Sequence, residues 1–231
     1  MQLCAIIVAA GKGNRLKIKT SKALIVINKK PALFHLLETL ESLDLIRHII
    51  LVARNKDQAA IRNLIKKSNF KKIKNIVCGG KERFDSVKAG LSHLCINCDL
   101  VMIHDGARPF IDKKTVTNCA RTAANFGAAV VGVPAKATIK KIKNRKSKII
   151  EETLDREQIW EIQTPQIFKK DIILKAYSMP YDKSVTDDSV LVERMGIKVR
   201  VVKGLYSNIK ITTPEDLIIA KAISETESAK R

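Results

Sequence analysis

Short apolar runs alternate with amphipathic segments over most of the chain. The apolar runs predict strands, and between them apolar residues recur at helical spacing, as at Leu33, Leu36, Leu37 and Leu40. We expect strands at 3–9, 48–53, 73–78, 100–104 and 128–133, and helices at about 31–43, 57–67, 85–94 and 113–125. This alternation predicts an α/β fold: a Rossmann-like three-layer αβα arrangement with a mostly parallel sheet covered on both faces.

The pattern changes near residue 136. Two β-like runs, 138–143 and 148–154, flank the basic turn Asn144-Arg145-Lys146-Ser147, which predicts a hairpin. This hairpin has no obvious core of its own. We therefore expect a β-arm at about 136–156 that projects from a single domain spanning 1–231 and packs on a second subunit. Strand and helix signals then resume at 163–177, 186–195 and 199–202, before a helix that begins near Thr213.

Polar residues follow three of the predicted strands, where parallel sheets bind their ligands. They are Gly11-Lys12-Gly13, Gly79-Gly80 and Asp105-Gly106. Glycines let backbone N–H groups approach a phosphate chain, and Lys12, Arg15 and Lys22 add positive charge. The spacing fits neither a P-loop nor a dinucleotide fingerprint, because Leu16 stands where the third glycine would be. A polyphosphate site of another kind, or a simple solvated turn, remains open at this point.

The formal net charge of +20 points to polyanions. Nucleic acid, a phosphorylated small substrate and a lysine-rich bias all fit this charge. Aromatic residues are only 4% of the chain and no zinc-finger, RRM or helix-turn-helix pattern occurs, so we expect no specific nucleic acid. No apolar run approaches the roughly 20 residues that span a membrane. No charged region precedes the first apolar run, so we read it as a strand and expect the cytoplasm.

Five cysteines occur, and Cys95-x-x-Cys98 is their only close pair. This pair is half of a zinc site or a redox dithiol, but a second Cys/His pair at metal-ligand spacing is missing. We expect isolated thiols in a reducing compartment.

The stretch Ala9 to Leu16, followed by Ser21-Lys22, resembles the signature of sugar-phosphate nucleotidyltransferases, whose loop wraps a nucleoside triphosphate. That family usually has proline where this chain has Ser21. Later motifs narrow the resemblance to the 2-C-methyl-D-erythritol 4-phosphate cytidylyltransferases of the non-mevalonate isoprenoid pathway, from Leu3 to about Ala222. These motifs are Gly79 to Val87, His104 to Phe110, Gln163 to Phe168, Thr186 to Ser189 and Asn208 to Thr212.

The resemblance implies transfer of CMP from CTP to 2-C-methyl-D-erythritol 4-phosphate. Pyrophosphate leaves, and 4-diphosphocytidyl-2-C-methyl-D-erythritol forms. It also implies Mg²⁺ and a homodimer in which an exchanged arm brings Arg156 into the partner's site. The implied catalytic cations are Arg15, Lys22 and Lys210. The implied CTP contacts are Ala9, Ala10, Gly11, Lys12, Gly13, Gly80, Arg83, Ser86 and Asp105, with Asp105 also near the metal. The implied methylerythritol phosphate contacts are Asp105, Arg108, Thr138, Arg156, Thr164, Thr186 and Lys210.

Two alternatives remain for the function, and one residue pair has two interpretations. Relatives that act on another polyol phosphate, such as ribitol 5-phosphate, share the loop and Thr164-Pro165-Gln166, although the run from Asp187 to Glu193 fits the methylerythritol type. A basic nucleic-acid-binding protein is the alternative from another class. Asp187 and Asp188 look like a second metal motif, but we expect helix capping there instead.

Overall fold

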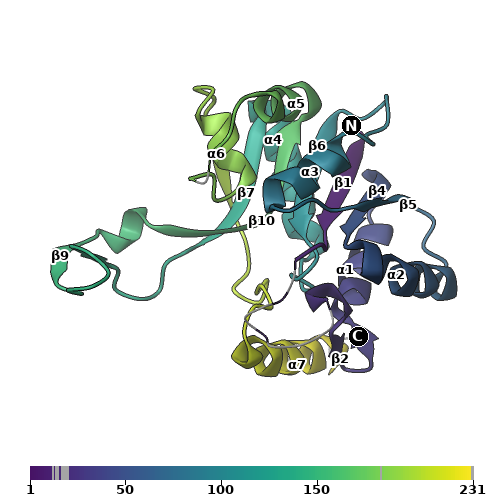
Figure 1. The fold of residues 1–231 in the computed structure, drawn as a ribbon, viewed down its shortest axis with the longest axis horizontal. Coiled ribbons are helices and arrows are strands. Elements are labelled where there is room, and N and C mark those ends of the chain that lie inside the picture. The colour runs from purple at the N-terminus through teal and green to yellow at the C-terminus, as the bar shows by residue number, and fades with distance from the viewer. Residues whose placement is uncertain (12, 14–15, 17–20, 183, 230–231) are drawn as a thin grey trace.

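The computed structural model describes residues 1–11, 13, 16, 21–182 and 184–229. Within these residues a seven-stranded sheet runs in the order β11-β7-β10-β6-β1-β4-β5 (Figure 1). Its strands are β1 (Leu3–Val8), β4 (Ile46–Ala53), β5 (Ile73–Cys78), β6 (Leu100–Asp105), β7 (Ala128–Pro134), β10 (Trp160–Lys169) and β11 (Arg200–Lys203).

The sheet is mostly parallel, as the sequence predicts. β1 pairs in parallel with β4 and β6, β4 with β5, and β11 with β7. β10 is antiparallel to both of its neighbours, β6 and β7. Because the chain leaves β7 through the arm and returns as β10, the two strands form the stem of one long hairpin, and hairpin strands pair antiparallel.

Helices cover both faces of the sheet, which confirms the three-layer prediction. α1 (Ala32–Glu41), α2 (Asn55–Ser68) and α4 (Lys113–Phe126) pack on one face through an apolar core. α3 (Arg83–Leu91), α5 (Lys170–Ser178) and α6 (Asp188–Glu193) pack on the other. Successive residues of β1 alternate between these two cores, so the whole strand is apolar.

A smaller apolar cluster holds α7 (Pro214–Ala229) to the body. It joins Ala220 of α7 to Phe110, Ile211 and Ile27, the last in a short hairpin of β2 (Val26–Ile27) and β3 (Lys30–Pro31). A short 3-10 helix, η2 (Lys22–Leu24), precedes that hairpin. The backbone N–H groups of Thr212 and Thr213 both donate to Asp216 Oδ2, at 2.7 and 2.8 Å. Asp216 therefore fixes the backbone at the start of this helix.

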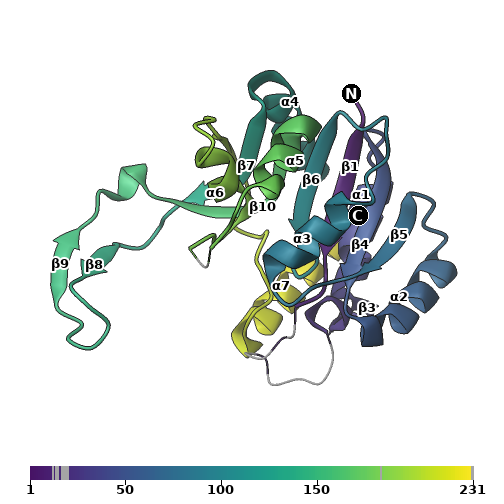
Figure 2. The ribbon, with the colours of Figure 1, turned by 45° about the horizontal axis from the view of Figure 1, so that its top comes forward.

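The predicted arm stands away from the body in both ribbon views (Figures 1 and 2). It is a separate two-stranded sheet of β8 (Lys140–Ile142) and β9 (Ile150–Thr153), followed by the 3-10 helix η3 (Arg156–Gln158). Every residue of both strands is exposed. No helix among the described residues is both long and apolar enough to span a membrane.

Candidate active site

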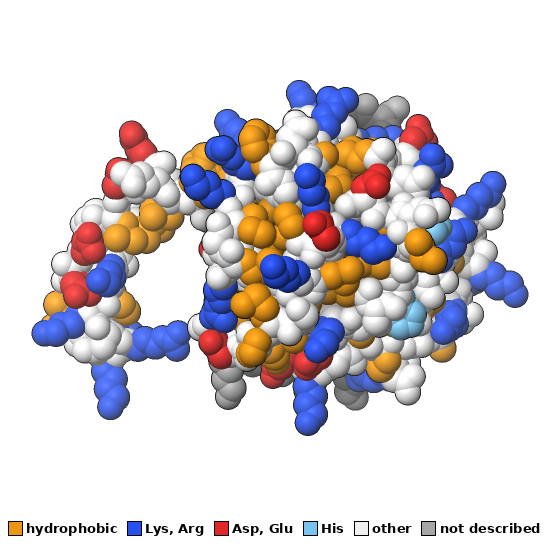
Figure 3. All heavy atoms as spheres, turned by 90° about the horizontal axis from the view of Figure 1, so that it is seen from above, with side chains coloured by type: hydrophobic (Ala, Val, Ile, Leu, Met, Phe, Trp, Pro, Cys, Tyr) orange, Lys and Arg blue, Asp and Glu red, His pale blue; other side chains and the backbone are white. Residues whose placement is uncertain are grey.

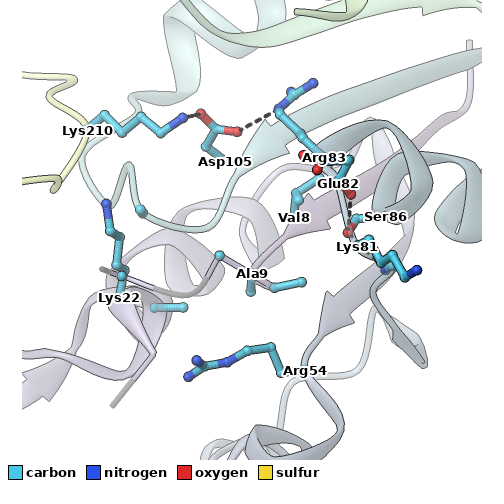
Figure 4. Close-up of a pocket in the computed structure, with 16 residues that line it drawn as sticks. Val8, Ala9, Lys22, Arg54, Lys81, Glu82, Arg83, Ser86, Asp105 and Lys210 are labelled. Carbon is cyan, nitrogen blue, oxygen red and sulfur yellow. Dashed lines mark hydrogen bonds and ion pairs between the residues drawn. The ribbon is translucent and has the colours of Figure 1, made fainter. Parts of the chain in front are cut away.

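A cavity of about 530 Å³ lies at the carboxyl ends of β1, β4, β5 and β6 (Figure 4). This is the edge at which the sequence places its glycine loops and Asp105. The described residues that line it are Val8, Ala9, Ala10, Gly11, Gly13, Lys22, Ala23, Arg54, Gly80, Lys81, Glu82, Arg83, Ser86, Asp105, Ala107 and Lys210.

The loop after β5 packs so closely on its neighbours that Gly79 and Gly80 have no space for a side chain. A Cβ at Gly79 would lie 2.4 Å from the Cβ of Ala10, and one at Gly80 would lie 2.2 Å from the Cβ of Asp85. The Ser86 hydroxyl accepts from the Gly80 N–H at 3.2 Å and donates to the Glu82 carbonyl at 3.1 Å. One acceptor position of that hydroxyl remains for a ligand.

α3 begins at Arg83, two residues earlier than the sequence suggested. Glu82 and Asp85 form a reciprocal capping box in which the Glu82 N–H donates to Asp85 Oδ2 at 3.0 Å. The usual capping box has serine or threonine in the first position, so glutamate gave no start signal there. The earlier start places Arg83 in the first turn, beside the cavity.

Asp105 is the centre of charge in the site. It ends β6, is only 6% exposed, and lies 2.6 Å from Lys210 Nζ, 3.4 Å from Arg83 Nε and 3.9 Å from Arg108 Nε. Burial by itself raises the pKa of Asp105, but Lys210, Arg83 and Arg108 outweigh burial and hold it well below the usual range. The carboxylate is therefore ionised at neutral pH, and it fixes the Lys210 ammonium beside the cavity.

Arg83 is held mainly by a second carboxylate. Its two terminal nitrogens donate to the two oxygens of Asp188, each at 2.7 Å, and the Tyr177 hydroxyl donates to Asp188 at 2.5 Å. Burial by itself lowers the pKa of Arg83. Asp188 and Asp105 raise this pKa by more than burial lowers it, so the guanidinium stays charged. Arg83 lines the cavity as predicted, while all three of its guanidinium nitrogens point to carboxylates.

One stretch of β10 positions most of these groups. Thr164 is buried, and its hydroxyl accepts from the Asp105 N–H at 3.1 Å. The Asn208 side-chain amide donates to Gln163 Oε1 at 3.0 Å and to the Thr164 carbonyl at 2.9 Å. The segment that carries Lys210 is thereby tied to the strand that orients Asp105.

Gln166 orients the carboxylates of the Thr186-Asp187-Asp188-Ser189 motif. Its Oε1 accepts from the N–H groups of Asp188 and Ser189 at 3.1 and 3.0 Å, and its amide donates to Asp187 at 2.9 Å. Asp187 accepts from the Val190 N–H at 3.2 Å and is the N-cap of α6. The structure supports capping by Asp187, and it gives Asp188 the role of holding Arg83.

Arg108 and His104 stabilise the turn after β6. Arg108 Nη1 donates to the Asn208 carbonyl at 2.8 Å, and its buried Nε has no hydrogen-bond partner among the described residues. His104 is fully buried, and its Nε2 donates to the Arg108 carbonyl at 3.1 Å. Burial lowers the pKa of His104 to about 4, so its ring is neutral at pH 7.

Comparison with known proteins shows which family the chain belongs to. The family model for 2-C-methyl-D-erythritol 4-phosphate cytidylyltransferase matches residues 3–226. The chain belongs to this family. Its members are CTP-dependent nucleotidyltransferases, so the protein is an enzyme of that class.

Individual relatives agree with this family along nearly the whole chain. The 2-C-methyl-D-erythritol 4-phosphate cytidylyltransferase of Alkaliphilus metalliredigens (strain QYMF) is 44% identical over 225 residues, 96% of this chain and 92% of the relative. Among solved structures, the 4-diphosphocytidyl-2C-methyl-D-erythritol synthase of Anaerococcus prevotii DSM 20548 has a TM-score of 0.85 and 34% identity, covering 97% of this chain and 96% of its own. The cytidylyltransferase of Francisella tularensis has a TM-score of 0.76 and 27% identity, covering 96% of this chain and 100% of its own.

The predicted residues of this family member fall into four groups. Arg108 and Thr164 do not line the cavity themselves, but both contact Asp105, which does. The cavity brings together Ala9, Ala10, Gly11, Gly13, Lys22, Gly80, Arg83, Ser86, Asp105 and Lys210. Thr138, Arg156 and Thr186 are exposed and do not line this chain's cavity, and Arg156 donates to the Lys136 carbonyl at 3.0 Å. Lys12 and Arg15 lie outside the described residues.

Sequence reasoning missed Arg54. It directly follows β4 and is not among the predicted site residues. Arg54 Nε contacts Asp57 Oδ2 at 2.5 Å, and the side chain is 16% exposed. Its buried Nη2 has no hydrogen-bond partner among the described residues, and the side chain lines the cavity (Figure 4). A basic residue after a strand was the available signal, because that edge of the sheet binds ligands.

The cavity suits a magnesium ion that arrives with a nucleotide. Mg²⁺ prefers oxygen ligands and is usually held by one or two carboxylates together with substrate phosphates. Among the described lining residues, Asp105 and Glu82 supply carboxylates. Glu82 already caps α3, which leaves Asp105 as the protein ligand that fits.

Proposed function

We propose that this cavity transfers CMP from CTP to 2-C-methyl-D-erythritol 4-phosphate. The observation that carries the proposal is the ionised Asp105 among Lys210, Arg83 and Arg108, directly beside the glycine loops at the strand ends. A phosphate oxygen of the acceptor attacks the α-phosphorus of CTP in line. The bond from that phosphorus to the bridging oxygen breaks, and pyrophosphate leaves with the electron pair.

Fixed cations supply most of the catalysis in this proposal. Negative charge grows on the non-bridging oxygens and on the leaving group, and preorganised cations stabilise it without reorganising. Lys22 and Lys210 both line the cavity (Figure 4). The resemblance adds Arg15. Asp105 holds the Lys210 ammonium at 2.6 Å and would hold Mg²⁺ together with the phosphates, where the ion neutralises phosphate charge.

The acceptor half of the site begins at Asp105 and Arg108. The Arg108 side chain is 13% exposed and lies in an ion pair with Asp105, so its positive charge suits the acceptor phosphate. Thr138, Thr164 and Thr186 stay predicted contacts for the polyol hydroxyls. Thr164 also acts indirectly, because its hydroxyl accepts a hydrogen bond from the Asp105 N–H.

The assay that tests this function compares acceptors and nucleotides by pyrophosphate release. We expect turnover with CTP and methylerythritol phosphate, and rates at least about 10²-fold lower with UTP or ATP, because a site that hydrogen-bonds one base leaves buried groups unpaired with another. Ribitol 5-phosphate serves as the second acceptor. Equal or better turnover of ribitol 5-phosphate would contradict the proposed acceptor.

Arg54 belongs to the nucleotide half of the site. Its side chain lines the cavity, where its positive charge would favour the CTP phosphates. We expect Arg54→Met to raise KM for CTP about 10- to 100-fold, the range of a hydrogen bond to a charged group, and to leave KM for the acceptor nearly unchanged. Asp57→Asn is the matched control, because it changes the ion pair of Arg54 and keeps the guanidinium. An equal rise in both KM values would contradict this placement.

A homodimer with exchanged arms completes the proposal. The arm presents exposed apolar side chains at Ile142, Ile149 and Ile150, which are 41%, 61% and 58% exposed (Figure 3). A second copy of the chain would cover them and would bring Arg156, from the base of the arm, toward the partner's acceptor. Arg156 does not line the cavity of its own chain, which supports a role across the interface.

A further inference from the structure

Three cysteines meet at the end of the sheet opposite the cavity. Cys4 lies near the start of β1, and Cys95 and Cys98 lie in the loop between α3 and β6. All three Sγ atoms lie within 4.8 Å of one another, and those of Cys4 and Cys95 are 2.9 Å apart. The sequence shows only the pair Cys95-x-x-Cys98; the fold supplies the third thiol from a residue more than ninety positions earlier.

The loop that carries two of these thiols is fixed at both ends. The N–H groups of Asp99 and Leu100 donate to the Gln2 carbonyl at 3.0 and 3.1 Å, which ties the loop to the start of β1. Lys170 Nζ donates to the carbonyls of Cys95 and Ile96, each at 3.0 Å. The three sulfurs are therefore held together by the surrounding structure before any ligand binds.

We propose that Cys4, Cys95 and Cys98 bind one zinc ion as thiolates. A zinc–sulfur distance of about 2.3 Å in tetrahedral geometry places sulfurs about 3.8 Å apart, within the spacing seen here, and Cys4 and Cys95 need to separate by only about 1 Å. On binding, each thiol releases its proton to solvent as its Zn–S bond forms. Zinc keeps its charge and takes no electron, so the step needs no oxidant or reductant.

The burial of the three thiols favours a metal over a disulfide. Cys4 and Cys98 are buried and Cys95 is half-buried, so the site is closed except beside Cys95. A disulfide would use two of the sulfurs and leave the third without a function. A soft cation uses all three. The other two cysteines are elsewhere: Cys78 is exposed at the end of β5, and Cys119 lies on the buried face of α4.

Among the described residues, the ligand atoms that lie together are the three sulfurs alone, and the fourth position of the ion opens toward the cavity lined by His48. His48 is the register partner of Cys4 on β4, and residues paired across parallel strands project from the same face of the sheet. His48 and Cys95 also line a second cavity of about 400 Å³, which opens beside the thiols. Zinc held by three protein ligands keeps a water molecule in its fourth position. The ion would bind β1 to the 92–99 loop and would stabilise the fold far from the cytidylyl-transfer cavity.

Zinc titration of the full chain tests the site. The protein is reduced, freed of metal with a chelator, and titrated with zinc against a chromophoric chelator. We expect one zinc per chain and a melting temperature about 5–10 °C higher at zinc a hundredfold above Kd. Cobalt should give the thiolate charge-transfer absorption of a sulfur-rich site. Neither measurement depends on enzyme activity, so the outcome is separate from the proposed function.

Variants decide which residues hold the ion. Cys95→Ser and Cys98→Ser should lower zinc affinity at least about 10-fold and abolish the thermal shift. Cys78→Ser is the matched control, the same substitution at an exposed cysteine, and should change nothing. Cys4→Ser is the third ligand variant, and its position lies in the core. If Cys4→Ser does not fold, the result for Cys95→Ser, at a half-buried position, decides the test. No zinc uptake, loss of uptake in Cys78→Ser, or a metal-free protein with a Cys4–Cys95 disulfide by mass spectrometry would each overturn the proposal.

Discussion

Two lysines with different supports face the same cavity. Lys210 is held by Asp105 at 2.6 Å, whereas Lys22 comes from η2 at the end of the glycine loop. In the proposed reaction both act on charge that develops only as the α-phosphorus is attacked. Removing either one should therefore lower kcat more than it changes binding of the ground state.

Lys22→Ala tests this directly. We expect turnover to fall about 10²–10³-fold, as for loss of one preorganised donor at a developing oxyanion, with the melting temperature nearly unchanged. Lys81→Ala is the control, because Lys81 lines the same cavity from another loop and has no assigned role. Single-turnover rates at saturating CTP give the measurement. A near-normal rate for Lys22→Ala would remove Lys22 from the mechanism.

His104 should make stability depend on pH. Burial holds its folded pKa at about 4, against an unfolded value of about 6.5. Between these values the unfolded chain binds a proton and the folded chain does not. The stabilisation is therefore complete above about pH 6.5 and is lost as the pH falls toward 4, with a total of about 3 kcal/mol.

Urea unfolding at several pH values between 7 and 4 measures this effect. His104→Gln keeps an N–H group for the Arg108 carbonyl and removes the titration. Its unfolding free energy should fall less between pH 6.5 and 4.5 than that of the wild type, whatever its stability at pH 7. Parallel curves for the two proteins would show that His104 does not cause the slope.

At the scale of elements, β10 organises the site although none of its residues lines the cavity. Thr164 bonds the Asp105 N–H, Gln163 and Thr164 hold Asn208, and Gln166 holds the α6 start with Asp188. Asp188 in turn holds Arg83. The direction of β10 brings Gln163, Thr164 and Gln166 beside the end of β6, because the antiparallel register places Gln166 opposite Ile103.

Thr164→Val tests whether the Thr164 hydroxyl acts by holding the Asp105 backbone. Valine keeps the shape of threonine but leaves the buried Asp105 N–H without its acceptor. We expect a loss of about 1–3 kcal/mol in unfolding free energy and a lower kcat, because the carboxylate that orients Lys210 is no longer fixed. Thr164→Ser, which keeps the hydroxyl, should retain most of both. Chemical unfolding and steady-state kinetics measure the pair, and equal behaviour of the two variants would contradict this role.

The sequence predicts the elements better than their long-range partners. Buried strands such as β1 are continuous apolar runs, and β5 is found at the predicted 73–78. The direction of β10 depends on how the chain returns from the arm. The pairing of Arg83 with Asp188 joins residues 105 positions apart, and the unpartnered Nη2 of Arg54 depends on the surrounding packing. Side-chain partners of this kind are set by tertiary structure and leave no local pattern.

At the scale of the whole molecule, the charge of +20 is widely distributed. Lysine and arginine side chains are scattered over the face shown in Figure 3, with apolar and acidic groups between them. The cavity concentrates cations in a different way, by placing Lys22, Lys210 and Arg54 around one space. The family supports an enzyme over a nucleic-acid-binding module, and the scattered surface charge fits that assignment.

Exchanged arms make a prediction that only a dimer can satisfy. Arg156 lies at the base of the arm, while Lys210 lines the cavity of the body. If each site takes Arg156 from one subunit and Lys210 from the other, Arg156→Ala and Lys210→Ala are inactive alone but complement each other when mixed. After random subunit exchange half of the dimers are mixed, and each has one fully native site, so activity should recover to about a quarter of the wild-type value. Mixing after mild denaturation and refolding, followed by a pyrophosphate-release assay, gives the measurement.

Two controls accompany the mixing experiment. Each variant refolded alone should stay inactive. Ile150→Glu on both chains should prevent recovery by placing charge on the apolar arm, whereas Ile218→Glu, at a 72% exposed position on α7, should not. If Arg156 instead served its own chain's cavity, every site in the mixture would lack one of the two residues. The mixture would then stay as inactive as its parts.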